Sequence, residues 1–167
     1  ILEADASDYE ATEVMMQAIK AHTGKLDVVI SNVAFGKTVQ TLDDLNRRHL
    51  ERSVAYSAWP LVDLVQLAQI TFGHFPRYVL GISSDGGAIC HPAYDLVGAS
   101  KAVLETLCRY LALRLKPHGT RVNAVRPGFL DTESARTTFG PATIAAIAER
   151  SPALLLDPAA VANVCVA

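Results

Sequence analysis

A tyrosine and a lysine seven residues apart are the residues best placed to do chemistry. Tyr94 and Lys101 fall in the segment Pro92–Lys101. Seven residues turn an α-helix by about 700°, so both side chains leave nearly the same side of the helix, roughly 10 Å apart along its axis. A phenol with an ordinary pKa of about 10 donates a hydrogen bond near neutral pH, and a nearby ammonium group favours a developing tyrosinate. Taken singly, Tyr94 also fits an aromatic packed at a helix start, and Lys101 a solvated helix residue.

Three short apolar segments predict the strands that position this pair. They are Leu26–Val33, Tyr78–Ser83 and Arg121–Val125. Each is a continuous apolar run, as expected for parallel strands covered on both faces. Helical patterns alternate with these runs, which is typical of βαβ units with right-handed crossovers. The sequence therefore predicts a Rossmann-like, doubly wound parallel sheet in a three-layer α/β/α domain.

Four helices are expected around these strands. The first is capped by Ser7 or Asp8 and closed by Gly24, a short one covers Leu42–His49, a long one covers Val54–Ile70, and the strongest covers Tyr94–Lys116, ended by Pro117 and Gly119. Pro60 predicts a kink or a later start in the long helix, because proline lacks the amide proton. The strongest helix is apolar beyond one face, with Leu96, Val103 and Tyr110 outside the main stripe, which predicts burial on more than one side.

Polar or glycine-rich residues follow each predicted strand. They are Ser31-Asn32, Ser83–Gly87 and Arg126–Gly128. In open α/β sheets, ligands bind beyond the carboxyl ends of the strands. Three such loops at one sheet edge predict a binding site there.

Composition narrows the classes of function. The 167 residues are 50% apolar and 19% charged, with a net charge of −2, which suits one domain over residues 1–167 and disfavours nucleic-acid binding. No apolar run approaches the ~18 residues of a membrane span, so we expect no membrane partner. The three cysteines are odd in number and far apart, which favours a reducing, cytoplasmic location. The five histidines show no paired spacing, and we expect no metal site.

Several motifs, in the same order, resemble those of the short-chain dehydrogenase/reductase superfamily. They are Asp5-Ala6, Ser31–Ala34, Ile82–Ser84, Ser100–Ala102, and Arg121–Gly128 followed by Asp131-Thr132. Ordinary members carry their tyrosine four residues before the lysine, where this chain has Val97. The Tyr-x6-Lys spacing of Tyr94 and Lys101 is similar to that of the enoyl-acyl-carrier-protein reductases, a divergent branch of the superfamily.

This resemblance implies an NADH- or NADPH-dependent reductase that acts on the carbon–carbon double bond of a 2-enoyl thioester in fatty acid biosynthesis. It implies catalytic roles for Tyr94, Lys101 and Ser84. It implies that the cofactor contacts Asp5, Ala6, Asn32, Val33, Ala34, Lys101, Pro127, Gly128, Leu130 and Thr132, and that the substrate pocket includes Phe35 and Tyr56. It also implies a homodimer or homotetramer, because family members pair the helix of the lysine with its copy in a neighbouring subunit.

Two other interpretations stay open at this point. Ser84 and Pro127-Gly128 match ordinary members, which indicates a carbonyl or 3-oxoacyl reductase or an alcohol dehydrogenase. Val97 at the ordinary tyrosine position favours a non-catalytic paralogue. Individual residues also have structural explanations, with Ser84 as a turn cap, Asp5 as a helix cap, and Phe35 and Tyr56 as core. We assign no role to His91.

The chain begins at Ile1 and ends inside the apolar run Val164–Ala167. The glycine-rich phosphate-binding turn of the superfamily is absent from the sequence. We therefore expect an internal piece of a longer protein that lacks the first βαβ segment and the last strand. On its own, such a piece is expected to be inactive and to bind a dinucleotide poorly.

Overall fold

The main sheet has three parallel strands in the order of the chain. In the computed structural model, which describes residues 1–151 and 154–166, they are β1 (Val28–Ser31), β2 (Tyr78–Ile82) and β3 (Arg121–Val125). The register places Val28 beside Tyr78 and Tyr78 beside Arg121. The three predicted strands are confirmed, and their carboxyl ends lie along one edge. A second parallel pair joins β4 (Phe129–Leu130) to β5 (Leu155–Leu156).

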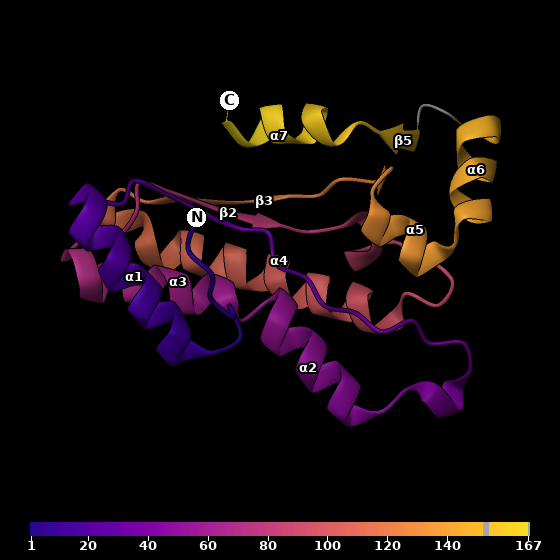
Figure 1. The fold of residues 1–167 in the computed structure, drawn as a ribbon, viewed down its shortest axis with the longest axis horizontal. Coiled ribbons are helices and arrows are strands. Elements are labelled where there is room, and N and C mark those ends of the chain that lie inside the picture. The colour runs from indigo at the N-terminus through magenta and orange to yellow at the C-terminus, as the bar shows by residue number, and fades with distance from the viewer. Residues whose placement is uncertain (152–153, 167) are drawn as a thin grey trace.

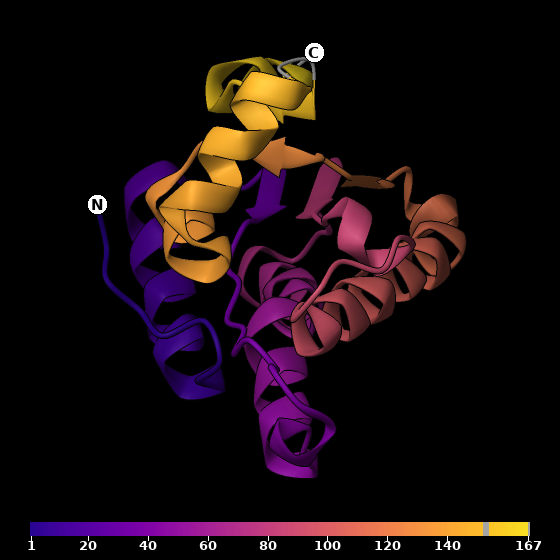
Figure 2. The ribbon, with the colours of Figure 1, turned by 90° about the vertical axis from the view of Figure 1, so that its right-hand side faces the viewer.

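Helices lie on both sides of the main sheet. They are α1 (Tyr9–Thr23), α2 (Arg47–Ser57), α3 (Pro60–Phe72), α4 (Asp95–Leu115), α5 (Glu133–Phe139), α6 (Pro141–Arg150) and α7 (Pro158–Val166). Helices α1–α4 lie on one side of β1–β3, while α7, in yellow, runs along the other side (Figure 1). The view at right angles shows the same layers, with the strands between the two groups of helices (Figure 2). The predicted α/β architecture is confirmed.

Local signals at the ends of α1 act as the sequence predicts. The Asp8 carboxylate accepts hydrogen bonds from the backbone amides of Glu10 and Ala11, which have no partner inside the helix. Gly24 ends the helix with a φ of 72°, a left-handed conformation that glycine adopts without strain.

The prediction of one helix over Leu42–His49 is wrong. A short 3₁₀ turn covers Leu42–Asp44 instead, and α2 begins only at Arg47. Two successive caps cause this. The Asp44 carboxylate accepts from the amide of Thr41, and the Asn46 side chain accepts from the amide of His49. Each cap starts a new helical segment, so the two segments cannot merge.

The long helix expected over Val54–Ile70 is two helices. Helix α2 ends at Ser57, and α3 starts with Pro60 as its first residue. Proline is favoured at that position because its missing amide proton would have no partner there. The later start predicted from Pro60 is therefore confirmed.

The core lies between the strands and α2–α4. Val29, Val79 and Val122 point from the three strands into a cluster with Leu61, Val65, Leu104, Cys108 and Leu115. On the opposite face of β1, Val28 and Ile30 remain 46% and 43% exposed. The expected cover of both faces is therefore incomplete at β1. In the part of the chain that the structure describes, no helix combines the length and the apolar character that crossing a membrane requires.

Candidate active site

A cleft opens at the carboxyl edge of the main sheet. Its volume of about 1040 Å³ is at the upper end of the range of small-molecule sites. Of the residues singled out from the sequence, it is lined by Asn32, Ala34, Phe35, Ser84, Tyr94, Lys101, Pro127, Gly128, Leu130 and Thr132. Residues from the ends of all three strands therefore meet in one cavity.

Four of the singled-out residues do not line this cleft: Asp5, Ala6, Val33 and Tyr56. Asp5 is exposed, and its carboxylate accepts hydrogen bonds from the amide and hydroxyl of Ser7 and, at 3.3 Å, from the hydroxyl of Tyr56. The backbone hydrogen bond from Ser7 is the main reason that the pKa of Asp5 lies below its ordinary value. Asp5 thus keeps an anionic carboxylate near, but outside, the cleft.

Phe35 is held at the cleft by the end of α2. The Ser57 hydroxyl accepts from the Phe35 amide at 3.0 Å and lies 3.1 Å from its carbonyl, to which it donates. The ring of Tyr56 packs on Phe35 with 5.5 Å between centroids, and the Arg52 guanidinium lies 4.3 Å above the Phe35 ring. Phe35 is therefore a cleft-lining side chain, and Tyr56 supports it from behind.

Tyr94 stands at the start of α4, against the turn Asp85–Gly87. Ala93, just before it, has a φ of 62°, a strained conformation for a residue with a side chain. A Cβ atom on Gly86 would lie 2.4 Å from the Tyr94 ring, and one on Gly98 would lie 2.5 Å from the Gly86 carbonyl oxygen. Only glycine at these two positions lets the turn, the helix and the tyrosine ring approach so closely.

Val97 occupies the position of the ordinary superfamily tyrosine, and it is closed in. A Cβ atom on Gly36 would lie 1.9 Å from a Val97 methyl carbon. Val97 is 8% exposed. A tyrosine ring at position 97 would displace the Gly36 segment, so the phenol of this site comes from Tyr94.

The Tyr94 hydroxyl donates to the Ser84 hydroxyl oxygen at 3.4 Å. Ser84 also accepts from the Gly86 amide, at 3.2 Å, and donates to Asp85 at 3.3 Å. Burial raises the pKa of Tyr94, the hydrogen bond to Ser84 opposes this, and the charge of Asp85 adds to the rise. Tyr94 is therefore a neutral hydrogen-bond donor around neutral pH.

Lys101 points into the sheet edge from the next turns of α4. Its side chain is buried, and Nζ donates to the carbonyl oxygen of Ile82 at 2.7 Å, at the end of β2. Burial lowers the pKa of Lys101 to about 8, because the charged ammonium loses hydration. The ammonium form therefore predominates at neutral pH, although the pKa lies not far above that pH.

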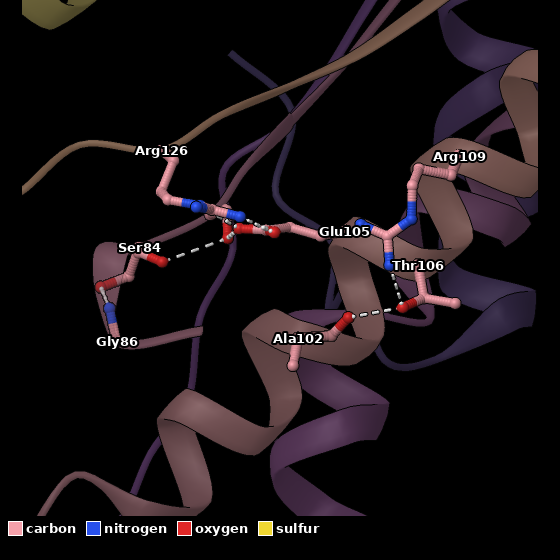
Figure 3. Close-up of polar contacts among 8 residues, drawn as sticks. Ser84, Gly86, Ala102, Glu105, Thr106, Arg109 and Arg126 are labelled. Carbon is pink, nitrogen blue, oxygen red and sulfur yellow. Dashed lines mark hydrogen bonds and ion pairs between the residues drawn. The ribbon is translucent and has the colours of Figure 1, made fainter. Parts of the chain in front are cut away.

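A buried carboxylate ties the elements of the site together. Glu105 of α4 accepts from the Ser83 hydroxyl at 2.7 Å and from both Nε, at 2.8 Å, and Nη2 of Arg126 (Figure 3). The hydrogen bonds from Arg126 are the main reason that the pKa of Glu105 lies below its ordinary value. Helix α4 is thereby fixed to the ends of β2 and β3. Ser83 and Lys101 line the cleft, whereas Glu105 and Arg126 lie outside its lining and hold this side of it in place. We call these four residues the polar wall.

The other side of the cleft is aromatic. Phe139 stacks on the Tyr94 ring with centroids 5.3 Å apart, Phe129 meets Phe139 at 5.4 Å, and His91 meets Phe129 at 5.0 Å. We call His91, Phe129 and Phe139 the aromatic wall. Sequence analysis missed its phenylalanines and gave His91 no role, because the segment that carries them shows no regular apolar period. The available signal was Phe129 directly after Gly128.

The arrangement combines a phenol, a buried ammonium group and an apolar wall around one cavity. A hydrogen-bond donor in such a place stabilises negative charge that develops on a substrate oxygen. In residues 1–151 and 154–166, no group of three or more His, Cys, Asp or Glu side chains could hold a metal ion.

The fold is similar to that of solved structures. An enoyl-(acyl-carrier-protein) reductase of Anaplasma phagocytophilum, in complex with NAD, superposes with a TM-score of 0.72 at 25% identity, covering 82% of this chain and 53% of that one. ElxO with NADP bound gives a TM-score of 0.74 over 85% of this chain and 58% of its own, at 20% identity, which shows the shared fold.

Sequence relatives agree with the structural ones. A 1-cyclohexenylcarbonyl-CoA reductase of Streptomyces collinus is 32% identical over 80% of this chain and 47% of its own length. An enoyl-[acyl-carrier-protein] reductase [NADH] of Synechocystis sp. is 28% identical over 84% and 55%. The chain therefore spans about half the length of these relatives. The family model described as enoyl-(acyl carrier protein) reductase matches residues 1–167. The chain belongs to the enoyl-(acyl carrier protein) reductase family.

Proposed function

We propose that the protein containing this chain is an NAD(P)H-dependent reductase of the carbon–carbon double bond of 2-enoyl thioesters. The observation that carries the proposal is the shared cleft of Tyr94 and Lys101, with Val97 packed against Gly36 at the ordinary tyrosine position. The substrate is a small or carrier-bound acyl thioester. Family membership and the reductases among the relatives support this proposal.

The residues at the cleft fit a reduced nicotinamide. Lys101 uses one of its three donors on the Ile82 carbonyl, which leaves donors for the ribose hydroxyls. Pro127, Gly128, Leu130 and Thr132 would surround the carboxamide, and Asn32 and Ala34 would line the approach to the ribose. Asp5, Ala6 and Val33 would contact the adenine end, outside the cleft. When bound, the reduced nicotinamide supplies a hydride.

Tyr94 acts on the oxygen of the substrate. Hydride addition to the β-carbon of a conjugated enoyl thioester moves negative charge onto the thioester oxygen, and the Tyr94 hydroxyl donates to that oxygen. The β-carbon lies two bonds beyond the carbonyl carbon. A phenol displaced toward the helix start suits an oxygen so far from the carbon that accepts the hydride. Lys101, Ser84 and the apolar side chain of Phe35 complete the catalytic and substrate-binding set.

We also propose a symmetric dimer or tetramer built through α4. Tyr110 and Leu113 are 62% and 70% exposed on this helix, and Val103 is exposed beside them. Leu96, which the sequence also placed outside the main apolar stripe, is instead buried within this chain. Pairing of α4 with its copy would cover the exposed residues. Three free cysteines accord with the cytoplasmic location that we propose.

One observation favours a second function on the same fold. Ser84, the serine of ordinary carbonyl reductases, lies in the cleft and accepts from Tyr94. A 3-oxoacyl or other carbonyl substrate would place its oxygen between these two hydroxyl groups.

Oxidation of NADH and NADPH by the full-length protein distinguishes these functions. We expect faster turnover with a 2-enoyl thioester than with the matching 3-oxoacyl thioester, by roughly tenfold for each 1.4 kcal/mol of extra transition-state stabilisation. Preference for the 3-oxo substrate would move the assignment to carbonyl reduction. Binding of the cofactor without turnover of either substrate would refute both.

A further inference from the structure

A line of polar groups leads from Tyr94 to the side of the cleft. The Tyr94 hydroxyl lies 3.4 Å from Ser84 Oγ, and Ser84 Oγ lies 3.3 Å from Asp85 Oδ1. The same Asp85 oxygen lies 3.1 Å from Nε2 of His91. Each step is therefore within hydrogen-bond distance, and Ser84, Asp85, His91 and Tyr94 all line the cleft.

His91 is the last group of this line. Its side chain is 15% exposed, and that of Asp85 is 25% exposed. Nε2 of His91 is buried and makes no hydrogen bond of proper geometry, although Asp85 Oδ1 lies within reach. At this distance of 3.1 Å, rotation of the imidazole ring would align its N–H with the carboxylate oxygen. Asp85 itself is fixed, since its amide donates to the Pro127 carbonyl at 3.0 Å.

Lys101 and Tyr94 make their hydrogen bonds to different groups. Its Nζ is turned to the Ile82 carbonyl, while the hydrogen bond made by the Tyr94 hydroxyl goes to Ser84. Lys101 is thus bonded to the end of β2, and the Ser84 side of the phenol is the side connected to an imidazole.

We propose that Asp85 and His91 form the outer end of a proton relay that returns a proton to Tyr94 through Ser84. This inference rests on the proposed reduction, because Tyr94 needs a new proton only after giving one to a substrate oxygen. His91 and Asp85 touch neither substrate nor cofactor in this scheme. They are positioning and proton-supplying residues.

The proton transfers of the relay conserve atoms and charge. The Tyr94 proton moves to the substrate oxygen, and the tyrosinate takes the Ser84 hydroxyl proton. Ser84 takes a proton from the Asp85 carboxyl group, which receives it from protonated His91. The imidazole ring of neutral His91 then turns Nε2 out to the solvent, where this nitrogen regains its proton from water. The relay moves protons only, and the electron pair that enters the substrate is that of the hydride.

Several charged or titratable groups face this line. Asp85 contacts His91 directly, and the Tyr94 ring lies edge-on to His91 with centroids 6.1 Å apart. The charge of Asp85 also contributes to raising the pKa of Arg126. Lys101, Glu133 of α5 and Cys165 of α7 line the same cleft. A pH profile therefore needs a comparison with a variant that removes only the imidazole.

His91→Gln in the full-length protein supplies that comparison, because glutamine keeps an N–H near Asp85 but carries no titratable proton. We expect kcat to fall at least about tenfold with KM and the unfolding midpoint retained, on whichever of the 2-enoyl and 3-oxoacyl substrates the protein reduces faster. The pH profile of kcat should also differ between the two proteins. His118→Gln, which changes a histidine packed on Phe75, is the matched control and should behave as wild type.

Added imidazole should restore kcat in His91→Ala, since free imidazolium can protonate Asp85 in place of the side chain. A His91→Gln variant with wild-type kcat and pH profile would overturn the relay. So would a His91→Ala variant whose lost rate is not restored by imidazole, because that result indicates a purely structural contact.

An NMR titration of histidine-labelled protein separates the relay from the proposed function. We expect Ser84→Ala and Asp85→Asn each to shift the His91 titration and to leave that of His118 unchanged. If neither thioester is reduced, the proposed function fails, and the relay is judged by this titration. A His91 signal insensitive to Ser84→Ala would then overturn the relay.

Discussion

The two walls of the cleft are held by different forces. The polar wall is fixed by charged and directional contacts, such as the bidentate pair of Glu105 with Arg126 and the hydrogen bond from Lys101 to Ile82. The aromatic wall is held by ring contacts among His91, Phe129 and Phe139. Directional hydrogen bonds set an angle, whereas aromatic rings slide over one another at little cost.

Tyr94 lies between the two walls. Its hydroxyl bonds to Ser84, beside the polar wall, and its ring stacks on Phe139 of the aromatic wall. Charge placement therefore depends on the polar wall, whereas the fit of an acyl group depends on Phe129 and Phe139 of the aromatic wall, and His91 serves the proton relay. Substitutions on the two walls should therefore change different quantities.

The largest effect is expected from Tyr94→Phe, which keeps the stacked ring and removes the hydroxyl. Loss of one donor to a developing oxyanion costs about 3–4 kcal/mol, so kcat should fall roughly 100- to 1000-fold. Steady-state kinetics of the full-length protein, with circular dichroism as the check on folding, measures this. Unchanged kcat would remove Tyr94 from the mechanism.

The burial of Lys101 should appear in the pH dependence of stability. Its pKa is lowered from 10.5 to about 8 in the folded state, so the unfolded chain binds more protons between these values and stability rises with pH in that window. The gain is up to about 3 kcal/mol, from 1.36 kcal/mol per pKa unit.

Denaturant unfolding of the wild type and Lys101→Met, on both sides of that window, tests this. The difference between them should shift in favour of the wild type as the pH rises. A difference that stays constant would mean that the ammonium group is hydrated.

Glu105→Gln should weaken the polar wall itself. It removes the charge that Arg126 faces while leaving an oxygen for Ser83, and we expect a loss of about 1.5–3 kcal/mol in the free energy of unfolding. Arg126 lowers the pKa of Glu105, so the stabilisation is present above the unfolded pKa and is lost as pH falls through the folded one.

The advantage of the wild type over Glu105→Gln should therefore vanish in acid. Glu149→Gln, at an exposed position of α6, is the matched control and should change stability by less than about 0.5 kcal/mol. An equal effect of both substitutions on the free energy of unfolding would show that the contacts of Glu105 stabilise the fold no more than an exposed carboxylate does.

The smallest effect is expected on the aromatic wall. Phe139→Leu keeps an apolar side chain but loses the stacking on Tyr94, which is worth about 0.5–1.5 kcal/mol. We expect KM for the acyl substrate to rise roughly 2- to 10-fold with kcat retained. A fall in kcat with unchanged KM would place Phe139 with the chemistry and erase the distinction between the walls.

The sequence predicted the strands and the helix ends better than the two walls of the cleft. The strands Tyr78–Ile82 and Arg121–Val125 are β-branched runs between clear helical patterns, and Asp8 and Gly24 are strong caps. These are local signals. Tyr94 and Lys101 also meet in one cleft, because Lys101 lies on α4 and Tyr94 directly precedes this helix.

The missed features depend on contacts between distant residues. Strands β4 and β5 have two residues each, and α5 has seven, so no period can develop in them. The burial of Glu105 against Arg126, and the contact of His91 with Asp85, arise only when separate loops meet at the sheet edge. The break at Asp44–Asn46 was missed because two caps stood inside one apolar pattern.

The central claim is that this sheet edge holds a reduced nicotinamide through Lys101. Fluorescence titration of the full-length protein with NADH and NADPH tests it most directly. We predict saturable binding of one or both by the wild type, and at least about tenfold weaker binding by Lys101→Ala, since a hydrogen bond from a charged group contributes about 1.5–3 kcal/mol. No binding by the wild type, or equal affinity in the two proteins, would contradict the account.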